Sequence, residues 1–475
     1  MVEQVEKMLI CTNCIGEPFL HDLVEKKGEK GQCDYCKEIG STISLKDLSK
    51  RIETVFQTHY ERTSTEPEDW INSFYQWERA GEPTIDAIMN AAVIPEEAAR
   101  TIQETLADKH LDFDEAAMDE GEFSSDAYYE EILPGSAEWQ AGWDLFEHTV
   151  KTQARFFSRV SASQLSELFD NIDQMKTSQG QSLIIEAGPE TNLKDLYRAR
   201  VFQSDDKLKL CMKRPDKELS APPSYFAYAG RMNARGISVF YGATSVSTAL
   251  AEVRPPVGSK VAVARFEIIR RLRLLDLSAL ADVNETGSVF DTGYAYRLGR
   301  MMFLRELSKR IVRPVMPDDQ EFEYLPTQAI ADFLATEGKV SLDGIVYPSV
   351  QVAGNGVNVV LFHKAAKCQK LEFPAGTELT AQTEKYEDDV EGLNTDYSVW
   401  ETIPQDVKTS DEDTCSDPLG PVPYLGEAEF LEHDEREETL SIDPNSMILH
   451  HVEAVQIDTT EFMVTRSRHI NHGDI

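Results

Sequence analysis

The sequence contains no apolar run long enough to cross a bilayer, since none approaches the roughly 18 residues that a membrane helix needs. It also lacks the basic segment followed by a hydrophobic stretch that marks a secretory signal. These two absences argue against a membrane protein and predict a cytoplasmic one. At 475 residues with 41% hydrophobic residues, the chain is long enough for about three cored domains.

Positive charge is also scarce, because the formal net charge is −36 at pH 7. This argues against general binding to nucleic acids or anionic membranes, both of which require a basic surface. The charge is unevenly spread: residues 196–314 carry 21 Lys and Arg against 11 Asp and Glu, whereas residues 384–440 carry 3 against 19. An anionic ligand would therefore meet favourable charge in the middle of the chain. The acidic end is interpreted as a contribution to solubility.

Cysteine is rare, and four of the seven cysteines fall within the first 36 residues. Cys11 and Cys14 form one CxxC pair, and Cys33 and Cys36 form a second pair after eighteen intervening residues. Two such pairs can supply the four thiolates of a tetrahedral zinc site, which would stabilise a segment too short to build a core alone. The spacing favours a structural zinc ribbon over residues 1–43 rather than a redox pair. The remaining cysteines have no near partners in sequence and are expected to be reduced.

Residues 44–176 are predicted to form a mainly helical domain. Its amphipathic segments are 45–60, 94–106 and 138–160. The last of these is predicted to be one long helix that contributes aromatic side chains to the core: Trp139, Trp143, Phe146, Phe156 and Phe157. The Gly- and Pro-containing residues 177–192 are expected to be a linker.

Strand and helix patterns alternate after this linker, which predicts a mixed α/β domain over residues 190–380. A basic amphipathic helix is expected at 294–311, and strands are expected at 196–200, 238–241, 260–269, 344–349 and 357–363. Residues 381–475 are predicted to be an acidic C-terminal extension, in which 447–464 returns as one or two strands. The predicted fold class is therefore multidomain α+β.

The stretch from Tyr225 to Arg254 combines a Gly-Arg-x-Asn turn, a short strand and a short helix. The helix is expected to end before Pro255, because proline lacks an N–H and its ring blocks the preceding turn. Glu252 falls in the last turn of this helix, where the helix dipole disfavours a carboxylate. A lone glutamate is usually a solvated surface residue. Beside an aromatic strand end and an Arg/Asn turn, Glu252 is interpreted as a site residue.

Four separated blocks of the chain resemble the RES domain: LYRAR at 196–200, GRMNARG at 230–236, FYGATSVSTALAE at 240–252, and GIVYPS at 344–349 with NVVLF at 358–362. The family takes its name from an Arg, a Glu and a Ser, which fall here at Arg198, Glu252 and Ser349. The front of the chain is similar to the HEPN/RES N-terminal region, in which a CxxC ribbon precedes helices. The Arg/His spacing of HEPN ribonucleases is absent from the helical region, so RNA cleavage is not expected there.

RES proteins resemble ADP-ribosyltransferases in fold, and known members are toxins that degrade NAD or transfer ADP-ribose. The resemblance therefore implies an ADP-ribosyltransferase-like RES domain with NAD as its substrate and with Arg198, Glu252 and Ser349 as catalytic residues. An arginine can hold the phosphates of NAD in a bidentate pair, and a tyrosine can stack on a ring. The candidates for binding NAD are Arg231, Tyr241, Asn233 and Asn358.

Cleavage of an N-glycosidic bond passes through an oxocarbenium-like ribose, which a carboxylate such as Glu252 can stabilise. Taken singly, Asn233 is also explained as a turn former and Ser349 as the close of a strand. The acceptor remains open between phosphate, water and a protein, and a non-catalytic nucleic-acid sensor built on residues 1–175 is the alternative from another class. The expected partners are NAD, an antitoxin or other regulatory protein, and a second copy of the chain.

Overall fold

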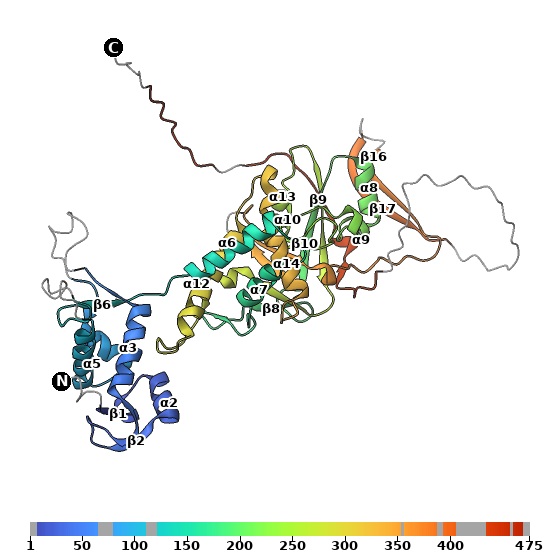
Figure 1. Cartoon of the computed structure of the whole chain (residues 1–475). Helices are drawn as coiled ribbons and strands as arrows, with labels where there is room; N and C mark the ends of the chain where they lie inside the picture. Colours follow the sequence, from blue (N-terminus) through green and yellow to red (C-terminus); the bar gives the residue numbers. More distant parts are fainter. Residues whose placement is uncertain are drawn as a thin grey trace, which may run out of the picture. The chain divides into compact units, whose positions relative to one another are not determined.

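The computed structural model describes seven stretches of the chain: residues 7–64, 79–110, 121–352, 356–386, 393–404, 434–456 and 459–468. The chain forms two compact units (Figure 1). The first unit is Met1–Leu183 with Ala279–Ile311, and the second is Ile184–Ser278 with Val312–Ile475. None of the helices in the described stretches combines the length and the apolar character that a bilayer crossing would require.

The first unit begins with a three-stranded sheet of order β1-β3-β2, and helix α2 (Pro18–Lys27) lies between β1 and β2 in sequence. Its strands are β1 (Leu9–Cys11), β2 (Glu29–Gln32) and β3 (Ile39–Ser44). Ser44 then caps helix α3 (Leu45–His59), because its side chain accepts a hydrogen bond from the backbone N–H of Asp47. The apolar face of α3 packs against helix α5 (Glu96–Lys109), and helix α4 (Thr84–Ala92) joins the same core. Helices α3 and α5 confirm the predicted segments 45–60 and 94–106. A second small sheet has the order β4-β6-β5, with strands Tyr60–Arg62, Tyr128–Glu131 and Glu82–Pro83.

The prediction of one helix over 138–160 is wrong. Helix α6 (Ala137–Thr152) ends first, and helix α7 (Arg159–Leu168) starts anew where Ser158 accepts a hydrogen bond from the N–H of Ser161. The residues before this cap are not helical, so Phe156 and Phe157 are 87% and 96% exposed instead of belonging to the core. The other three aromatic residues lie on α6. Trp143 and Phe146 are buried as predicted, and Trp139 is partly buried.

Helix α12 (Tyr294–Val312) was predicted from its pattern and packs with α6 and α7. The Trp139 Nε1–H donates to the Tyr296 carbonyl over 3.1 Å, and the Arg300 Nε–H donates to the Leu168 carbonyl over 2.9 Å. Strands β7 (Lys176–Thr177) and β13 (Val283–Asn284) pair beside these helices.

The second unit is built on a mixed sheet of order β18-β11-β9-β10-β15-β14-β12-β8, in which β19 also pairs with β11. The sheet curls into a half-barrel. Its only parallel pair within the described residues is β12 with β14. The strands are β8 (Ile184–Ala187), β9 (Asp195–Phe202), β10 (Phe240–Ala243), β11 (Lys260–Ile268), β12 (Leu272–Asp276), β14 (Gly344–Pro348), β15 (Val357–Leu361), β18 (Leu440–Ile442) and β19 (Ile448–His451).

Most expected strands of this unit are present, with β10 two residues later than predicted. The expected linker at 177–192 is wrong, because it contains β8, whose Ala187 is buried and pairs with Leu272 of β12. Gly188 next to it has φ +121°, and a Cβ there would lie 2.3 Å from the Arg270 carbonyl oxygen. This glycine therefore permits a close approach of two backbones rather than providing linker flexibility.

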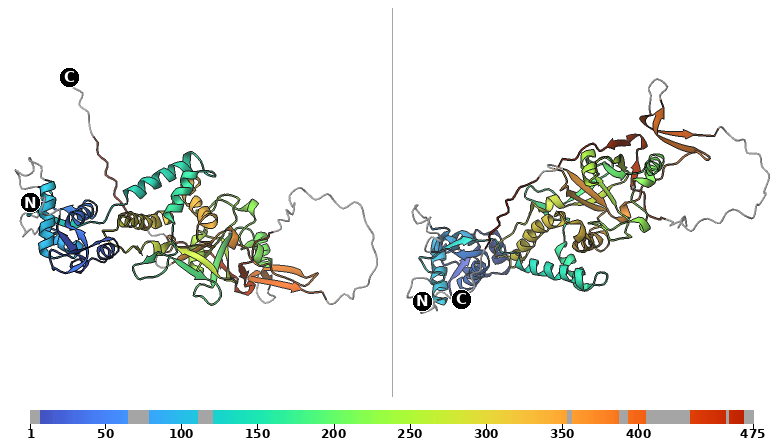
Figure 2. Two further views of the ribbon diagram at one scale, coloured as in Figure 1. Left: turned by 60° about the horizontal axis from the view of Figure 1, so that its bottom comes forward. Right: turned by 90° about the horizontal axis from the view of Figure 1, so that it is seen from above.

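The residues after the main domain also form strands. Within the described residues, β16 (Glu378–Tyr386) and β17 (Leu393–Thr402) pair only with each other, and they form the orange ribbon in Figure 2. β18 and β19 return to the edge of the main sheet, where Leu440 is fully buried. The strand expected within 447–464 is thus β19, and no further strand occurs in the described residues after it.

Helix α10 (Val246–Glu252) follows β10 directly and packs on the sheet beside β9 and β10 (Figure 1). Ser245 caps it by accepting a hydrogen bond from the N–H of Thr248 over 3.2 Å. The predicted apolar face is confirmed, because Ala249 is buried and Leu250 and Val253 pack against the same cluster. This packing fixes the position of Glu252, the last helical residue.

Candidate functional site

Four neighbouring strands place one residue each in a single row across the sheet. Tyr197 of β9 pairs with Ala243 of β10, Ala243 pairs with Asn358 of β15, and Asn358 pairs with Tyr347 of β14. Directly paired residues of antiparallel strands point to the same face of a sheet. The row lines a cavity of about 240 Å³, and the end of α10 contributes Glu252 to its wall.

The carboxylate of Glu252 is held by one of its two oxygens. The Ser349 hydroxyl donates to Oε1 over 2.5 Å, and the Asn358 side-chain amide donates to the same atom over 2.7 Å. Both donors are buried. Within the described stretches, no donor reaches Oε2. The arrangement therefore fixes the carboxylate and leaves its second oxygen for a ligand in the cavity.

Ser349 lies behind Glu252 and does not line the cavity itself. Its hydroxyl accepts a hydrogen bond from the N–H of Gln351 over 3.1 Å, and its own N–H donates to the Gly356 carbonyl over 2.7 Å. The hydroxyl proton is thus free to point at Glu252. Ser349 directly follows the end of β14, as one of the two interpretations of the sequence predicts, and it also orients the carboxylate of Glu252.

Tyr241 lines the cavity, and the turn that precedes its strand holds its hydroxyl group. The hydroxyl donates to Asn233 Oδ1 over 2.8 Å and accepts from the N–H of Met232 over 3.1 Å. Burial raises the pKa of Tyr241 to about 12, so the phenol is neutral at physiological pH. A Cβ at Gly230 would lie 2.7 Å from both the Tyr241 hydroxyl oxygen and Asn233 Oδ1, so only glycine fits there.

Asn233 and Arg231 are not among the residues that line the cavity. The Asn233 amide donates to three carbonyls of its own loop, which makes it the organiser of the turn. The Arg231 guanidinium donates to the Arg313 carbonyl over 2.8 Å and lies 4.9 Å above the ring of Tyr324. Helix α14 (Leu325–Thr336) supports the same turn, because Thr327 donates to the Arg231 carbonyl. Contact of these two residues with NAD stays a prediction.

Arg198 lies where β9 and β10 diverge. Their only registered pair joins Tyr197 to Ala243, so the Tyr241 carbonyl is left to accept from the Arg198 guanidinium over 3.3 Å. The guanidinium lies 5.0 Å from the centre of the Phe240 ring, and Arg198 also lines the cavity. Desolvation, together with nearby positive charge, lowers the pKa of Arg198 to about 10, which keeps it a cation at neutral pH. No acidic side chain of the described residues pairs with it, so its charge is available to an anion.

Two tyrosines of the cavity, Tyr197 and Tyr347, were not predicted from the sequence. Both stand inside sequence blocks that had been singled out, LYRAR and GIVYPS. Burial raises the pKa of Tyr347, so it is also a neutral phenol. Their common row with Asn358 depends on strand register, which no local pattern encodes. The one local hint concerned Tyr197, which lies two residues before Ala199 and therefore on the same face of its strand.

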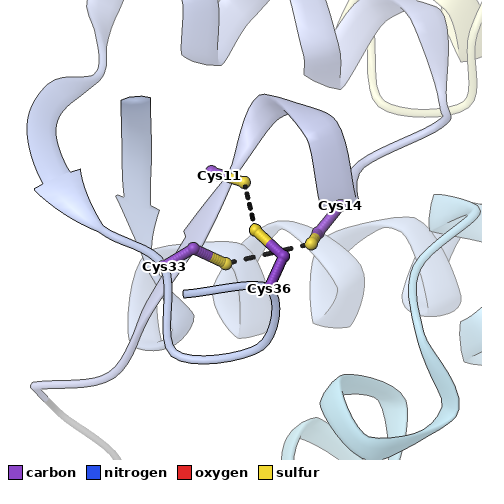
Figure 3. Close-up of side chains that lie close together, drawn as sticks. All are labelled: Cys11, Cys14, Cys33 and Cys36. Carbon is purple, nitrogen blue, oxygen red and sulfur yellow. Dashed lines mark hydrogen bonds between the residues drawn. The ribbon is translucent and has the colours of Figure 1, made fainter. Parts of the chain in front are cut away.

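The four N-terminal cysteines come together in the first unit, as Figure 3 shows. All four sulfur atoms lie within 4.8 Å of one another, with Cys11 and Cys36 at 3.4 Å and Cys14 and Cys33 at 3.8 Å. In a tetrahedral site with zinc–sulfur bonds of about 2.3 Å, the sulfurs are about 3.8 Å apart. The donor set and its spacing therefore fit zinc.

The two CxxC turns also carry backbone contacts suited to thiolates. The backbone N–H groups of Asn13 and Cys14 interact with the Cys11 sulfur, and those of Tyr35 and Cys36 interact with the Cys33 sulfur. Such N–H groups stabilise negative charge on sulfur. They are the contacts expected of turns that hold a metal.

Comparison with known families gives two matches. Residues 207–386 match the model of the RES domain, and residues 26–164 match the model of HEPN/RES N-terminal domain 1. The first match contains Glu252, Ser349 and Asn358 and begins after Arg198. The second contains Cys33 and Cys36 and begins after Cys14. No curated protein and no solved structure matches the chain.

Proposed function

Since the chain combines a HEPN/RES N-terminal domain with a RES domain, we propose that it is an enzyme that consumes NAD by cleaving the bond between nicotinamide and ribose. RES domains generally occur in NAD-degrading toxins. The observation that carries the proposal is the convergence of Ser349 and Asn358 on one oxygen of Glu252 at the wall of a cavity. The boundaries 1–43, 44–176, 190–380 and 381–475 and the ADP-ribosyltransferase-like fold are part of the same proposal.

The chemistry needs few groups. When the glycosidic bond breaks, its electron pair goes to the ring nitrogen, so nicotinamide leaves as a neutral molecule and requires no proton. The positive charge passes to the ribose, where a fixed carboxylate stabilises it. Glu252 supplies that carboxylate through its free oxygen. Ser349 and Asn358 orient it, so that no reorganisation is needed as the charge develops.

The cavity suits one end of a dinucleotide. Its volume of about 240 Å³ is below the roughly 300 Å³ at which pockets for whole ligands begin. It would hold the nicotinamide ribose, with the aromatic rings of Tyr197, Tyr241 and Tyr347 as its walls. Arg198 would meet the phosphates at the diverging strands, since a guanidinium binds phosphate oxygens with paired hydrogen bonds.

The acceptor decides which reaction class the enzyme belongs to. Attack by water gives ADP-ribose and a proton, whereas attack by phosphate gives the phosphate ester of ADP-ribose. Attack by a protein side chain would make the chain a protein ADP-ribosyltransferase, which is the second candidate because it would use the same cavity. The full chain is therefore incubated with NAD, with and without phosphate and with a mixture of proteins, and the products are identified by mass spectrometry. NAD that stays intact in every arm would end the proposal.

We further propose that the activity serves as an intracellular toxin or defence effector and that the cysteine cluster holds a structural zinc. All four ligand positions would be filled by thiolates, which leaves no open position for catalysis. The expected partner is an antitoxin or other regulatory protein. Induced expression in cells should lower cellular NAD and stop growth, and Glu252→Gln should do neither.

A further inference from the structure

A larger cavity lies entirely within the first unit and contains none of the residues discussed so far as ligands of NAD or of a metal. Its volume is about 730 Å³, and its walls are α2, β3, α3 and residues 289–295. Cavities of about 300–1,000 Å³ are typical of small-molecule sites. Its size therefore suits a small-molecule ligand.

Three cations at this cavity form no close ion pair with an acid in the described stretches, although Arg51 is attracted to Asp47 at longer range. They are Lys27 at the end of α2, Lys30 on β2 and Arg51 on α3. The chain as a whole carries 83 acidic residues against 47 Lys and Arg, so a cavity at which cations outnumber acids differs from the rest of the chain. Their shared location favours an anionic ligand.

The acids at the cavity offset this charge only in part. Asp47 is bonded to Ser44 and is 3.3 Å from Lys50, and Asp291 accepts from Arg297 over 3.0 Å. Glu29 is the remaining acid at the cavity and lies on the exposed strand β2. The four cations at the cavity, Lys50 included, therefore outnumber its three acids, one of which is already paired with Arg297.

His59 offers hydrogen-bonding groups to a ligand at this cavity. It is 3% exposed, lines the cavity and stacks on Tyr294 with ring centres 6.0 Å apart. Neither ring nitrogen has a hydrogen-bond partner in the part of the chain that the structure describes. Burial lowers the pKa of His59, so the ring is neutral and presents one donor and one acceptor. The ring nitrogens are not among the fully buried polar atoms that lack a partner, so they are reached from the cavity and can bond to a group that enters it.

The rest of the wall is apolar on one side, with Val55 and the buried Phe290, and carries the Thr54 and Thr58 hydroxyls on α3. We propose that this cavity binds a phosphate-bearing anion of nucleotide size. Its phosphates lie against Lys27, Lys30 and Arg51, because arginine and lysine are the usual partners of phosphate oxygens. Its organic part lies on the apolar wall, within hydrogen-bonding reach of His59.

The test uses the full chain with its metal and three probes: ADP, inorganic pyrophosphate and adenosine. Lysine acetylation followed by mass spectrometry locates the bound probe, and calorimetry measures its affinity. ADP and pyrophosphate should protect Lys27 and Lys30, whereas adenosine should not. Lys26 is the internal control, since it lies on the same helix, pairs with Asp22 and does not line the cavity.

Three variants test the groups. Lys27→Gln and Arg51→Gln should each weaken the binding of ADP about tenfold, the loss expected for one hydrogen bond to a charged group. Lys26→Gln should leave the affinity unchanged. His59→Phe keeps a ring beside Tyr294 and removes both nitrogens, so it should weaken ADP more than pyrophosphate. If ADP binds more tightly than pyrophosphate, the ligand is a nucleotide; equal binding identifies the phosphates alone as the recognised group.

The proposal fails if neither phosphate probe protects Lys27 and Lys30, if adenosine protects them equally, or if Arg51→Gln keeps the full protection. It is independent of the proposed reaction with NAD. Glu252→Gln should abolish the consumption of NAD and leave the protection of Lys27 and Lys30 unchanged.

Discussion

Replacing Asn358 by leucine isolates one of the two hydrogen bonds that orient Glu252. Leucine has nearly the same volume and no donor, so Oε1 keeps only the bond from Ser349. A hydrogen bond to a charged group contributes about 1.5–3 kcal/mol, which corresponds to about 10- to 150-fold in rate if the bond is fully used in the transition state. The expected result is a fall of that size in kcat/KM for NAD.

The assay is nicotinamide release from NAD by the full chain, together with a melting curve of each variant. Asn445→Leu is the matched control, since Asn445 is exposed on a short turn of the same unit and lies away from the cavity. Ser349→Ala should cause a similar fall, and the double variant should lose less than the product of the two, because both bonds end on one oxygen. A folded Asn358→Leu variant within about twofold of the original kcat/KM would refute the role given to this bond.

Two further changes test the supporting structure. Cys33→Ser should remove zinc from the purified chain and lower the melting temperature of the first unit, because metal binding and folding are coupled. The control variant Cys368→Ser should do neither. Freshly purified protein without zinc would contradict the proposed zinc site. Gly230→Ala should lower both stability and NAD consumption, since its Cβ would push Tyr241 and Asn233 apart. Gly40→Ala, where a Cβ meets nothing within 4 Å, is its control, and an unaffected Gly230→Ala variant would show that Tyr241 need not be held in place.

The sequence predicted those features that rest on local patterns. The apolar spacing of residues 246–253 and the prolines after them place Glu252 at the end of a helix packed on the sheet, and the structure confirms this. The spacing of the two CxxC pairs likewise predicted that four thiols come together. Periodicity and the short spacing of metal ligands are local properties of the sequence, so they can be interpreted without knowledge of the fold.

Features that depend on register or on distant partners could not be predicted. Ser349 and Asn358 are 97 and 106 residues from Glu252, and their meeting on one oxygen depends on how β14 and β15 align. The row of residues that includes Tyr197 and Tyr347 likewise depends on the register between neighbouring strands.

Local signals also misled where a competing interaction was stronger. The cap at Ser158 splits the helix that periodicity extended through Phe157. Strand β8 forms inside the expected linker, because β12 offers it a pairing edge and the core accepts Ala187. In both cases a specific contact decided the structure: the hydrogen bond from the N–H of Ser161 to Ser158 in the first, and the pairing of β8 with β12 in the second.

The most direct test of the proposed function is the rate of nicotinamide release from NAD by the purified full chain, compared between the original sequence and Glu252→Gln. Glu267→Gln serves as control, because Glu267 is exposed on β11 and lies outside the cavity. The account predicts release by the original chain and by Glu267→Gln, and none above background for Glu252→Gln. Equal release by all three proteins, or no release by any of them, would contradict it.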